Sequence, residues 1–76
     1  MSHTWKVLLF AHLRERHGES AMVDAEPTVR AVLEALATQG ITTQSCRLAA
    51  DHQFCKLDDA LTPGSELALI PPVSGG

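Results

Sequence analysis

Residues 67–76 read Leu67-Ala68-Leu69-Ile70-Pro71-Pro72-Val73-Ser74-Gly75-Gly76, an apolar run followed by two prolines and a final pair of glycines. The apolar run predicts a short strand, and the prolines end it because proline has no N–H to donate to a sheet. The two glycines bury no side chain and leave the backbone free. We therefore expect residues 1–70 to form the folded domain. Residues 71–76 are expected to form a flexible arm that spans at most about 20 Å.

The composition predicts one small folded domain. Of the 76 residues, 45% are hydrophobic and 20% are charged, which is typical of a globular protein. The net charge of −3 and the scattered cations give no basic surface for nucleic acid. No apolar run approaches the roughly 20 residues that cross a bilayer, and the first residues show no signal peptide. The sequence therefore predicts a cytoplasmic protein that binds neither nucleic acid nor membrane.

Residues with reactive side chains show no pattern of an active site. Cys46 and Cys55 are too few for a disulfide framework and lack CxxC spacing, so we expect two reduced thiols that fill space. Four histidines lack metal-ligand spacing and are expected at the surface or its boundary: His3, His12, His17 and His52. No P-loop, GxSxG or GxGxxG motif is present. The sequence therefore predicts no metal site, no bound cofactor and no active site of its own.

The expected order of elements is β-β-α-β-β-β with one main helix. Strands are predicted at residues 5–11, 20–25, 47–50, 54–55 and 66–70. Residues 12–17 predict one or two helical turns, ended by Gly18. The main helix is expected from Thr28, a natural N-cap residue, to Gly40, with an apolar stripe at Val29, Val32, Leu33 and Leu36. A mixed sheet around one helix, with its first and last strands as parallel neighbours at the centre, is a β-grasp arrangement of the α+β class.

One helix covers only one face of such a sheet, and the other face is predicted to be apolar. Alternation in the first strand places one set of side chains toward the core, namely Trp5, Val7, Leu9 and Ala11, and the other set toward solvent, namely Lys6, Leu8 and Phe10. The last strand directs Leu67 and Leu69 inward and Ile70 outward. We expect Leu8, Phe10 and Ile70, with Phe54 alongside, to form an exposed apolar patch that binds a partner.

The chain resembles the MoaD family, the small sulfur-carrier subunits of molybdopterin synthase, over essentially its whole length. The resemblance rests on Lys6-Val7-Leu8-Leu9-Phe10-Ala11 followed by Leu13-Arg14-Glu15 and Gly18, on the helix from Thr28-Val29 to Leu36, and above all on residues 61–76 with their Pro-Pro-Val-Ser-Gly-Gly end. The chain departs from the family at Asp51-His52, where many members have Asn-Gln, and in its aliphatic final strand. The resemblance implies a ubiquitin-like β-grasp fold.

The resemblance also implies a sulfur relay at the chain terminus. An adenylating enzyme related to ubiquitin activators (MoeB-like) would use ATP to convert the Gly76 carboxylate to an acyl-adenylate, and a persulfide would then leave a thiocarboxylate. The sulfur would pass to cyclic pyranopterin monophosphate in the active site of a large (MoaE-like) subunit, within a heterotetramer. The arm entering that site would comprise Pro71, Pro72, Val73, Ser74, Gly75 and Gly76, and the partner surface would comprise Leu8, Phe10, Arg14, Phe54 and Ile70.

Three alternatives remain open from the sequence. A sulfur carrier of thiamin-thiazole or cysteine biosynthesis has the same fold and also ends in Gly-Gly, and only the two prolines favour the molybdopterin interpretation. A ubiquitin-like protein modifier would form an isopeptide with lysine after the same adenylation. A plain interaction domain would bind a partner through its apolar patch and leave the tail inert.

Overall fold

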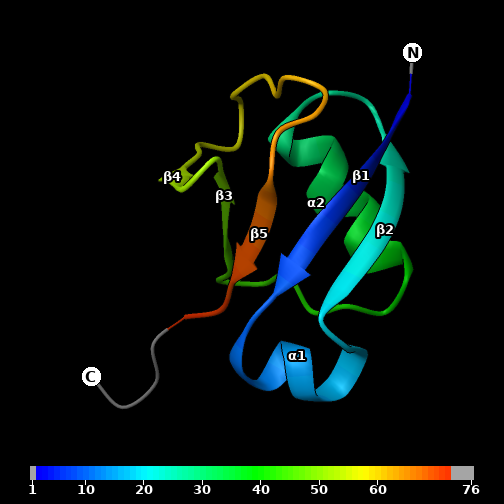
Figure 1. The fold of residues 1–76 in the computed structure, drawn as a ribbon, viewed down its shortest axis with the longest axis vertical. Coiled ribbons are helices and arrows are strands. Elements are labelled where there is room, and N and C mark those ends of the chain that lie inside the picture. Colours follow the sequence, from blue (N-terminus) through cyan, green and yellow to red (C-terminus); the bar gives the residue numbers. More distant parts are fainter. Residues whose placement is uncertain (1, 73–76) are drawn as a thin grey trace.

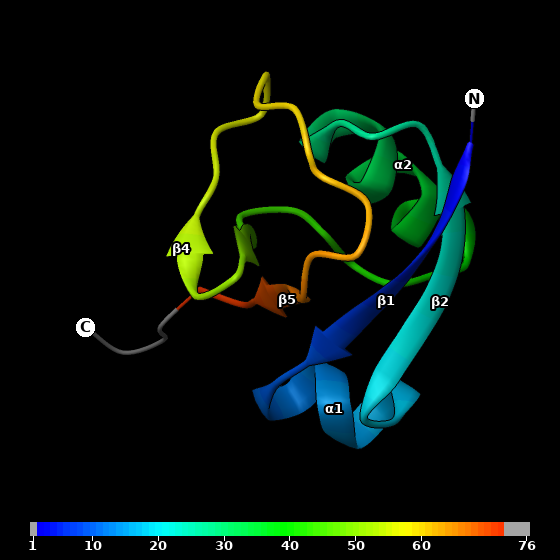
Figure 2. The ribbon, with the colours of Figure 1, turned by 45° about the horizontal axis from the view of Figure 1, so that its top comes forward.

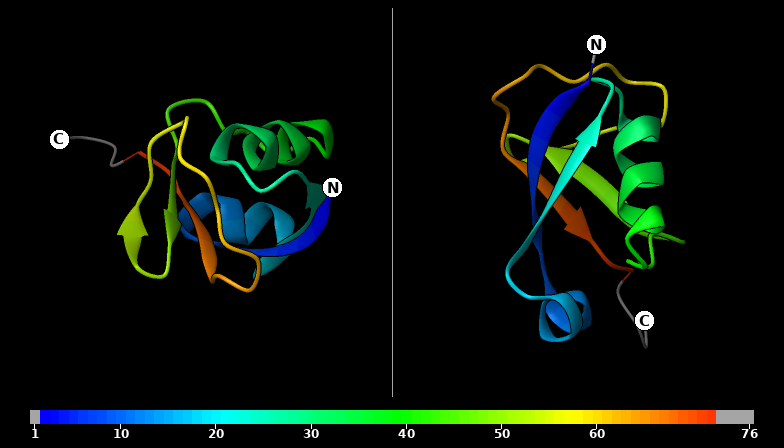
Figure 3. Two further views of the ribbon diagram at one scale, coloured as in Figure 1. Left: turned by 90° about the horizontal axis from the view of Figure 1, so that it is seen from above. Right: turned by 90° about the vertical axis from the view of Figure 1, so that its right-hand side faces the viewer.

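The computed structural model describes residues 2–72. Its elements, in chain order, are β1 (His3–Leu9), α1 (Ala11–His17), β2 (Ser20–Ala25), α2 (Val29–Thr38), β3 (Arg47–Ala50), β4 (Gln53–Phe54) and β5 (Leu67–Ile70). The described strands form one sheet in the order β2-β1-β5-β3-β4, and α2 lies against one face of it (Figure 1). Two views at right angles to the first show the helix and the sheet as separate layers (Figure 3). The structure has the mixed sheet and the α+β class that the sequence predicts.

The first and last strands form the centre of the sheet. β1 and β5 run parallel, with Val7 opposite Leu67 and Leu9 opposite Leu69. β2 pairs antiparallel with β1, and β3 pairs antiparallel with both β5 and β4. The short helix α1 occupies the connection between β1 and β2, at the end of the sheet where β1 finishes (Figure 2). The predicted parallel pairing of the outermost strands in sequence is therefore confirmed.

The core lies between α2 and the covered face of the sheet. Side chains from alternate positions of the strands meet the helix stripe there, as the alternation predicts. Trp5 contributes the largest of them, and its indole Nε1–H donates a 3.0 Å hydrogen bond to the carbonyl oxygen of Ala25, which satisfies its polar atom. The fully enclosed side chains are Val7, Leu9, Leu13, Val29, Val32, Leu36, Leu48, Leu67 and Leu69. Leu33, predicted in the stripe, is only partly buried at its edge.

α2 begins at a capping residue and is tied to a distant loop. The hydroxyl oxygen of Thr28 accepts a hydrogen bond of 3.2 Å from the backbone N–H of Ala31, so the predicted N-cap is confirmed. The backbone N–H of Val29 donates to the carbonyl of Asp59, and that of Leu61 donates to the carbonyl of Pro27. These bonds hold the segment between β4 and β5 against the start of the helix.

The first strand differs from the prediction at both of its ends. It runs from His3 to Leu9, because its parallel pairing with β5 ends at Leu9 and Leu69. Phe10 then accepts backbone hydrogen bonds from Leu13 and Arg14, which starts α1 at Ala11. The prediction that Ala11 faces the core in an extended strand was therefore wrong. Ala11 is exposed, with a φ of 52°.

Three further positions differ from the sequence prediction. Pro71 is buried, although it was expected to belong to the arm that follows the folded domain. Ile41, which follows the predicted main helix and lies in none of the predicted elements, is 4% exposed and belongs to the core. The short return strand is Gln53–Phe54, one residue earlier than predicted, because a two-residue turn at Asp51 and His52 is enough to reverse the chain.

The cysteines and histidines lie where the sequence predicts. Cys46 and Cys55 are unpaired, partly buried and packed against the core. His12 and His52 are exposed, and His3 and His17 are half-buried. Among the residues that the structure describes, no helix is both long and apolar enough to cross a membrane.

Candidate functional site

The open face of the sheet carries a hollow whose floor is made of alanines. Strand register sets a row across the sheet, in which Leu8 lies opposite Ala68, Ala68 opposite Ala49, and Ala49 opposite Phe54. The two small side chains at the centre of the row leave a depression between the larger ones. We call it the open-face hollow, lined by Leu8, Phe10, Ala49, His52, Phe54, Glu66, Ala68 and Ile70.

The size and exposure of the open-face hollow suit a protein partner. Its volume is about 230 Å³, below the roughly 300–1,000 Å³ typical of small-molecule pockets. Phe10 is 42% exposed and Phe54 is 54% exposed, so two aromatic rings stand at its rim without cover from the described part of the chain. A depression of this size can accept one bulky side chain from another protein.

The structure brings together four of the five predicted partner-binding residues. Leu8, Phe10, Phe54 and Ile70 all line the open-face hollow, so their predicted common surface is confirmed, whereas their role in binding stays a prediction. Arg14 lies beside them on α1. Its guanidinium forms an exposed ion pair of 3.2 Å with Glu19, next to a shallow depression that also includes Phe10.

Arg47 stands at the end of the hollow where the last strand finishes. It lies opposite Ile70 in the β3–β5 pair, and its guanidinium carbon is 3.9 Å from the centre of the Phe54 ring. Arg47 was not among the partner-binding residues predicted from the sequence. The alternation of residues 47–50 would have placed it on the open face, but its stacking on Phe54 depends on the β3–β4 register, which no periodicity shows.

At the opposite end of the hollow, two hydrogen bonds join Asp51 to Glu66. Asp51 donates its backbone N–H to the carbonyl of Glu66, and the Asp51 carboxylate accepts the backbone N–H of Glu66, both at 2.9 Å. Asp51 and His52 have φ values of 49° and 71°, so the turn is left-handed at both residues. These two hydrogen bonds place His52 and Glu66 on the wall of the hollow, and neither residue was predicted there from the sequence.

The predicted tail is only partly visible. Pro71 is buried and Pro72 is exposed directly after β5. The remaining predicted tail residues, Val73, Ser74, Gly75 and Gly76, lie outside the described residues. The structure therefore places the start of the tail at the end of the central strand β5, beside Arg47, the partner of Ile70.

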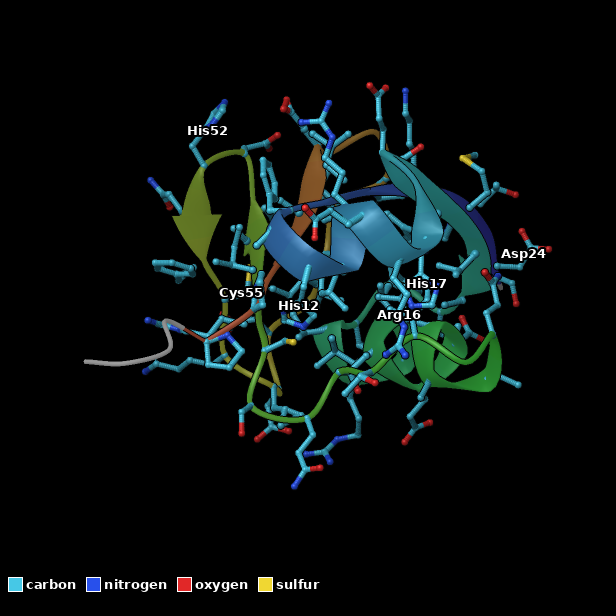
Figure 4. The ribbon with its side chains drawn as sticks, turned by 90° about the horizontal axis from the view of Figure 1, so that it is seen from below. His12, Arg16, His17, Asp24, His52 and Cys55 are labelled. Atoms are coloured by element: carbon cyan, nitrogen blue, oxygen red, sulfur yellow. The ribbon has the colours of Figure 1, made fainter. Side chains whose placement is uncertain are left out.

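The titratable side chains of residues 2–72 are dispersed over the surface of the domain. Within this range no three His, Cys, Asp or Glu side chains gather as metal ligands, and no charged side chain is buried. Figure 4 shows His52 on the β3–β4 turn, well apart from His12 and His17 on α1. Burial raises the pKa of the Cys46 thiol, which makes it a poor nucleophile near neutral pH.

Comparison with known proteins gives related sequences and structures. The sequence model of the ThiS family matches residues 7–76. The "Molybdopterin synthase sulfur carrier subunit" of Escherichia coli (strain K12) is 37% identical over 79 aligned positions, which cover 93% of this chain and 98% of that protein. The crystal structure of SAMP1 from Haloferax volcanii has a TM-score of 0.73 at 30% identity and covers 97% of this chain and 100% of that one. A structure of H. volcanii small archaeal modifier protein 1 has a TM-score of 0.73 at 25% identity, covering 92% and 98%.

Proposed function

This chain belongs to the ThiS family, and on that basis we propose that it is a sulfur carrier, the small subunit of a molybdopterin synthase. The observation that carries the proposal is the 37% identity to a molybdopterin synthase sulfur carrier subunit over nearly the full length of both chains. The family match also extends to residue 76, so it includes the Gly75-Gly76 pair.

The proposed chemistry takes place at Gly76 and is done by partner enzymes. A carboxylate oxygen attacks the α-phosphorus of ATP and releases pyrophosphate, which gives an acyl-adenylate. The terminal sulfur of an enzyme persulfide then displaces AMP, and a thiol cleaves the resulting S–S bond to leave the Gly76 thiocarboxylate. That sulfur would attack cyclic pyranopterin monophosphate to build the dithiolene of molybdopterin. Gly76 has no side chain, so attack on its carbonyl is unhindered.

The proposed partners are the large catalytic subunit and an adenylating enzyme of the ubiquitin-activator type, each using the open-face hollow in turn. The exposed rims at Phe10 and Phe54 support docking at this face. Pro72, Val73, Ser74 and Gly75 would then lead Gly76 into the partner's active site. A heterotetramer of two small and two large subunits is part of the proposal.

Mass spectrometry of the intact chain tests the chemistry. After incubation with the adenylating enzyme, ATP and a persulfide donor, the chain should gain about 16 Da, the difference between sulfur and oxygen at Gly76. The matched control is the same chain without Gly76, which should gain nothing. An unchanged mass in the complete chain, with an enzyme shown to adenylate it, would reject the sulfur-carrier proposal.

A second candidate function is protein modification. It is favoured by the fold likeness to SAMP1 and small archaeal modifier protein 1 of Haloferax volcanii, at 30% and 25% identity. In that case the adenylated Gly76 would be transferred to a lysine amine, and the products would be branched conjugates rather than a thiocarboxylate. Tryptic peptides with the chain's terminal residues on lysine would support this function. Sulfur carriers for thiamin-thiazole or cysteine synthesis would share the 16 Da gain, and they differ in the acceptor that takes the sulfur.

A further inference from the structure

The guanidinium of Arg47 is free to bind a carboxylate from another protein. Its Cζ atom lies over the Phe54 ring, 3.9 Å from the ring centre, and no carboxylate among residues 2–72 forms an ion pair with it. Stacking uses the face of a guanidinium and leaves its N–H groups free in the plane. Those N–H groups can bind a carboxylate with two parallel hydrogen bonds. Arg47 is therefore an exposed donor beside Phe54, at the end of the open-face hollow.

Any protein that covers the open-face hollow also covers Arg47. Phe54 is part of the hollow's wall, and a partner that packs on this ring removes water from the guanidinium stacked on it. Burying an unpaired cation is strongly unfavourable, whereas a carboxylate in contact offsets that cost. A partner that fits this face must therefore bring an anion to the position of Arg47.

The position of Arg47 also orients the partner. Arg47 lies opposite Ile70, the last residue of β5, so the cation marks the side of the hollow from which the chain continues to Pro71. The far wall carries the acidic Glu66 instead, with Lys6 in a neighbouring depression. A partner docked in the reverse orientation along the hollow would place its acidic group beside Glu66 instead of Arg47. That acidic group would then lose the ion pair with Arg47 and lie beside the like charge of Glu66, which disfavours that orientation.

We propose that the surface docking on the open-face hollow presents one bulky apolar side chain and, beside it on the side of the departing tail, a carboxylate that pairs with Arg47. The two alanines of the floor define the space for the apolar side chain, and the stacked Arg47 defines the place of the carboxylate. The inference rests on the proposed function for the existence of the partner, the large synthase subunit. It adds the chemistry by which that partner is recognised and aligned with the tail.

Calorimetric titration of the complete chain with the large subunit tests the charged contact. Arg47→Glu should weaken binding at least about thirtyfold, and Arg47→Lys should weaken it less, since lysine keeps the charge without the planar fork. Arg30→Glu is the matched control, because Arg30 is an equally charged, exposed residue on α2 outside the hollow, and it should bind within about twofold of the unchanged chain. Raising salt should weaken the unchanged chain more than Arg47→Ala. Binding of Arg47→Glu equal to that of the control overturns the charged contact.

The apolar contact is tested by filling the hollow. Ala68→Leu places a larger apolar side chain on the floor while keeping the strand, so it should weaken binding at least about tenfold. Equal or tighter binding would mean that the partner lies on a flat patch, and the proposed side-chain insertion would be rejected. Thermal melting of each variant confirms that it is folded.

The two proposals fail in different ways. A 16 Da gain together with normal binding of Arg47→Glu leaves the sulfur-carrier function standing and rejects the role of Arg47. No gain in mass, together with binding that depends on Arg47, rejects the sulfur chemistry and keeps the recognition. If the unchanged chain does not bind the large subunit at all, both proposals are rejected.

Discussion

Leu69 of β5 lies opposite Leu9 of β1 in the parallel pair at the centre of the sheet, and both side chains are buried. The next residue, Ile70, turns to the open face and lines the hollow, and Pro71 follows at the end of the strand. Two adjacent residues therefore connect the core to the proposed docking surface. The point from which the tail departs is set by the parallel strand pair at the centre of the sheet.

We predict that Leu69→Ala lowers the free energy of unfolding by about 2–5 kcal/mol, the usual cost of a cavity at a fully buried leucine. Ile70→Ala is the matched control, because it removes side-chain carbons of the same kind one position away, from a half-buried site on the open face. It should cost clearly less. Urea denaturation of both variants measures the difference. Equal losses would show that Ile70 is packed as tightly as Leu69 and that the open face is covered.

The buried Pro71 predicts where the chain can be shortened. A chain ending at Pro72 should melt within a few degrees of the complete one, whereas a chain ending at Ile70 loses the packing of Pro71 and should melt lower. In a domain of this size, about 1 kcal/mol shifts the melting temperature by roughly 4–8 °C. Calorimetric melting of the two truncated chains measures the difference. A large loss in the chain ending at Pro72 would mean that residues 73–76 pack on the domain.

The alternation of side chains was enough to predict the two faces of the sheet, and the reasons are local. Trp5, Val7 and Leu9 alternate with Lys6 and Leu8 along one extended strand, and such alternation depends on the backbone alone. Ala11 was predicted wrongly because its helical, left-handed start depends on where the β1–β5 pairing stops. No local sequence pattern shows where that strand pairing ends.

The candidate site could be predicted only in part for the same reason. Leu8, Phe10 and Ile70 share a face by alternation within their own strands. The hollow needs Ala68 beside Ala49, and this depends on the register of β5 against β3. The stacking of Arg47 on Phe54 depends on a further register set by a two-residue turn. Contacts between strands distant in sequence are fixed by tertiary packing, which one sequence does not display.

The left-handed turn at Asp51 and His52 predicts a stabilising substitution. Glycine adopts positive φ without the cost that other residues pay, so His52→Gly should raise the free energy of unfolding by about 0.5–1 kcal/mol. Asp51→Gly is the control, because it gains the same freedom but loses the 2.9 Å hydrogen bond from the Glu66 backbone to the Asp51 carboxylate. It should be less stable than His52→Gly. The prediction is contradicted if urea denaturation finds His52→Gly less stable than the unchanged chain.

The partly buried Cys46 predicts slow alkylation and a loss of stability at high pH. Burial raises the pKa of its thiol above the usual value, so the folded chain holds less of the reactive thiolate than the unfolded chain at the same pH. The unfolded chain then loses its proton first as pH rises, and this favours unfolding above about pH 9. Iodoacetamide at pH 8.5 should therefore modify Cys46 more slowly in the native chain than in urea. Equal rates would show that the thiol is fully solvated.

The exposed ring of Phe10 predicts a variant that separates binding from folding. Phe10 is 42% exposed at the rim of the hollow, and its role at the start of α1 is carried by its backbone carbonyl, which alanine retains. Phe10→Ala should therefore leave the melting temperature nearly unchanged and weaken binding to the large subunit by about 1–3 kcal/mol. Met22→Ala is the matched control, because Met22 is 54% exposed on the same face, opposite Lys6 in the β1–β2 pair, but outside the hollow. Calorimetric titration of both variants compares the two positions. If Met22→Ala weakens binding as much as Phe10→Ala, the partner covers the β2 side of the face and the hollow is not its centre.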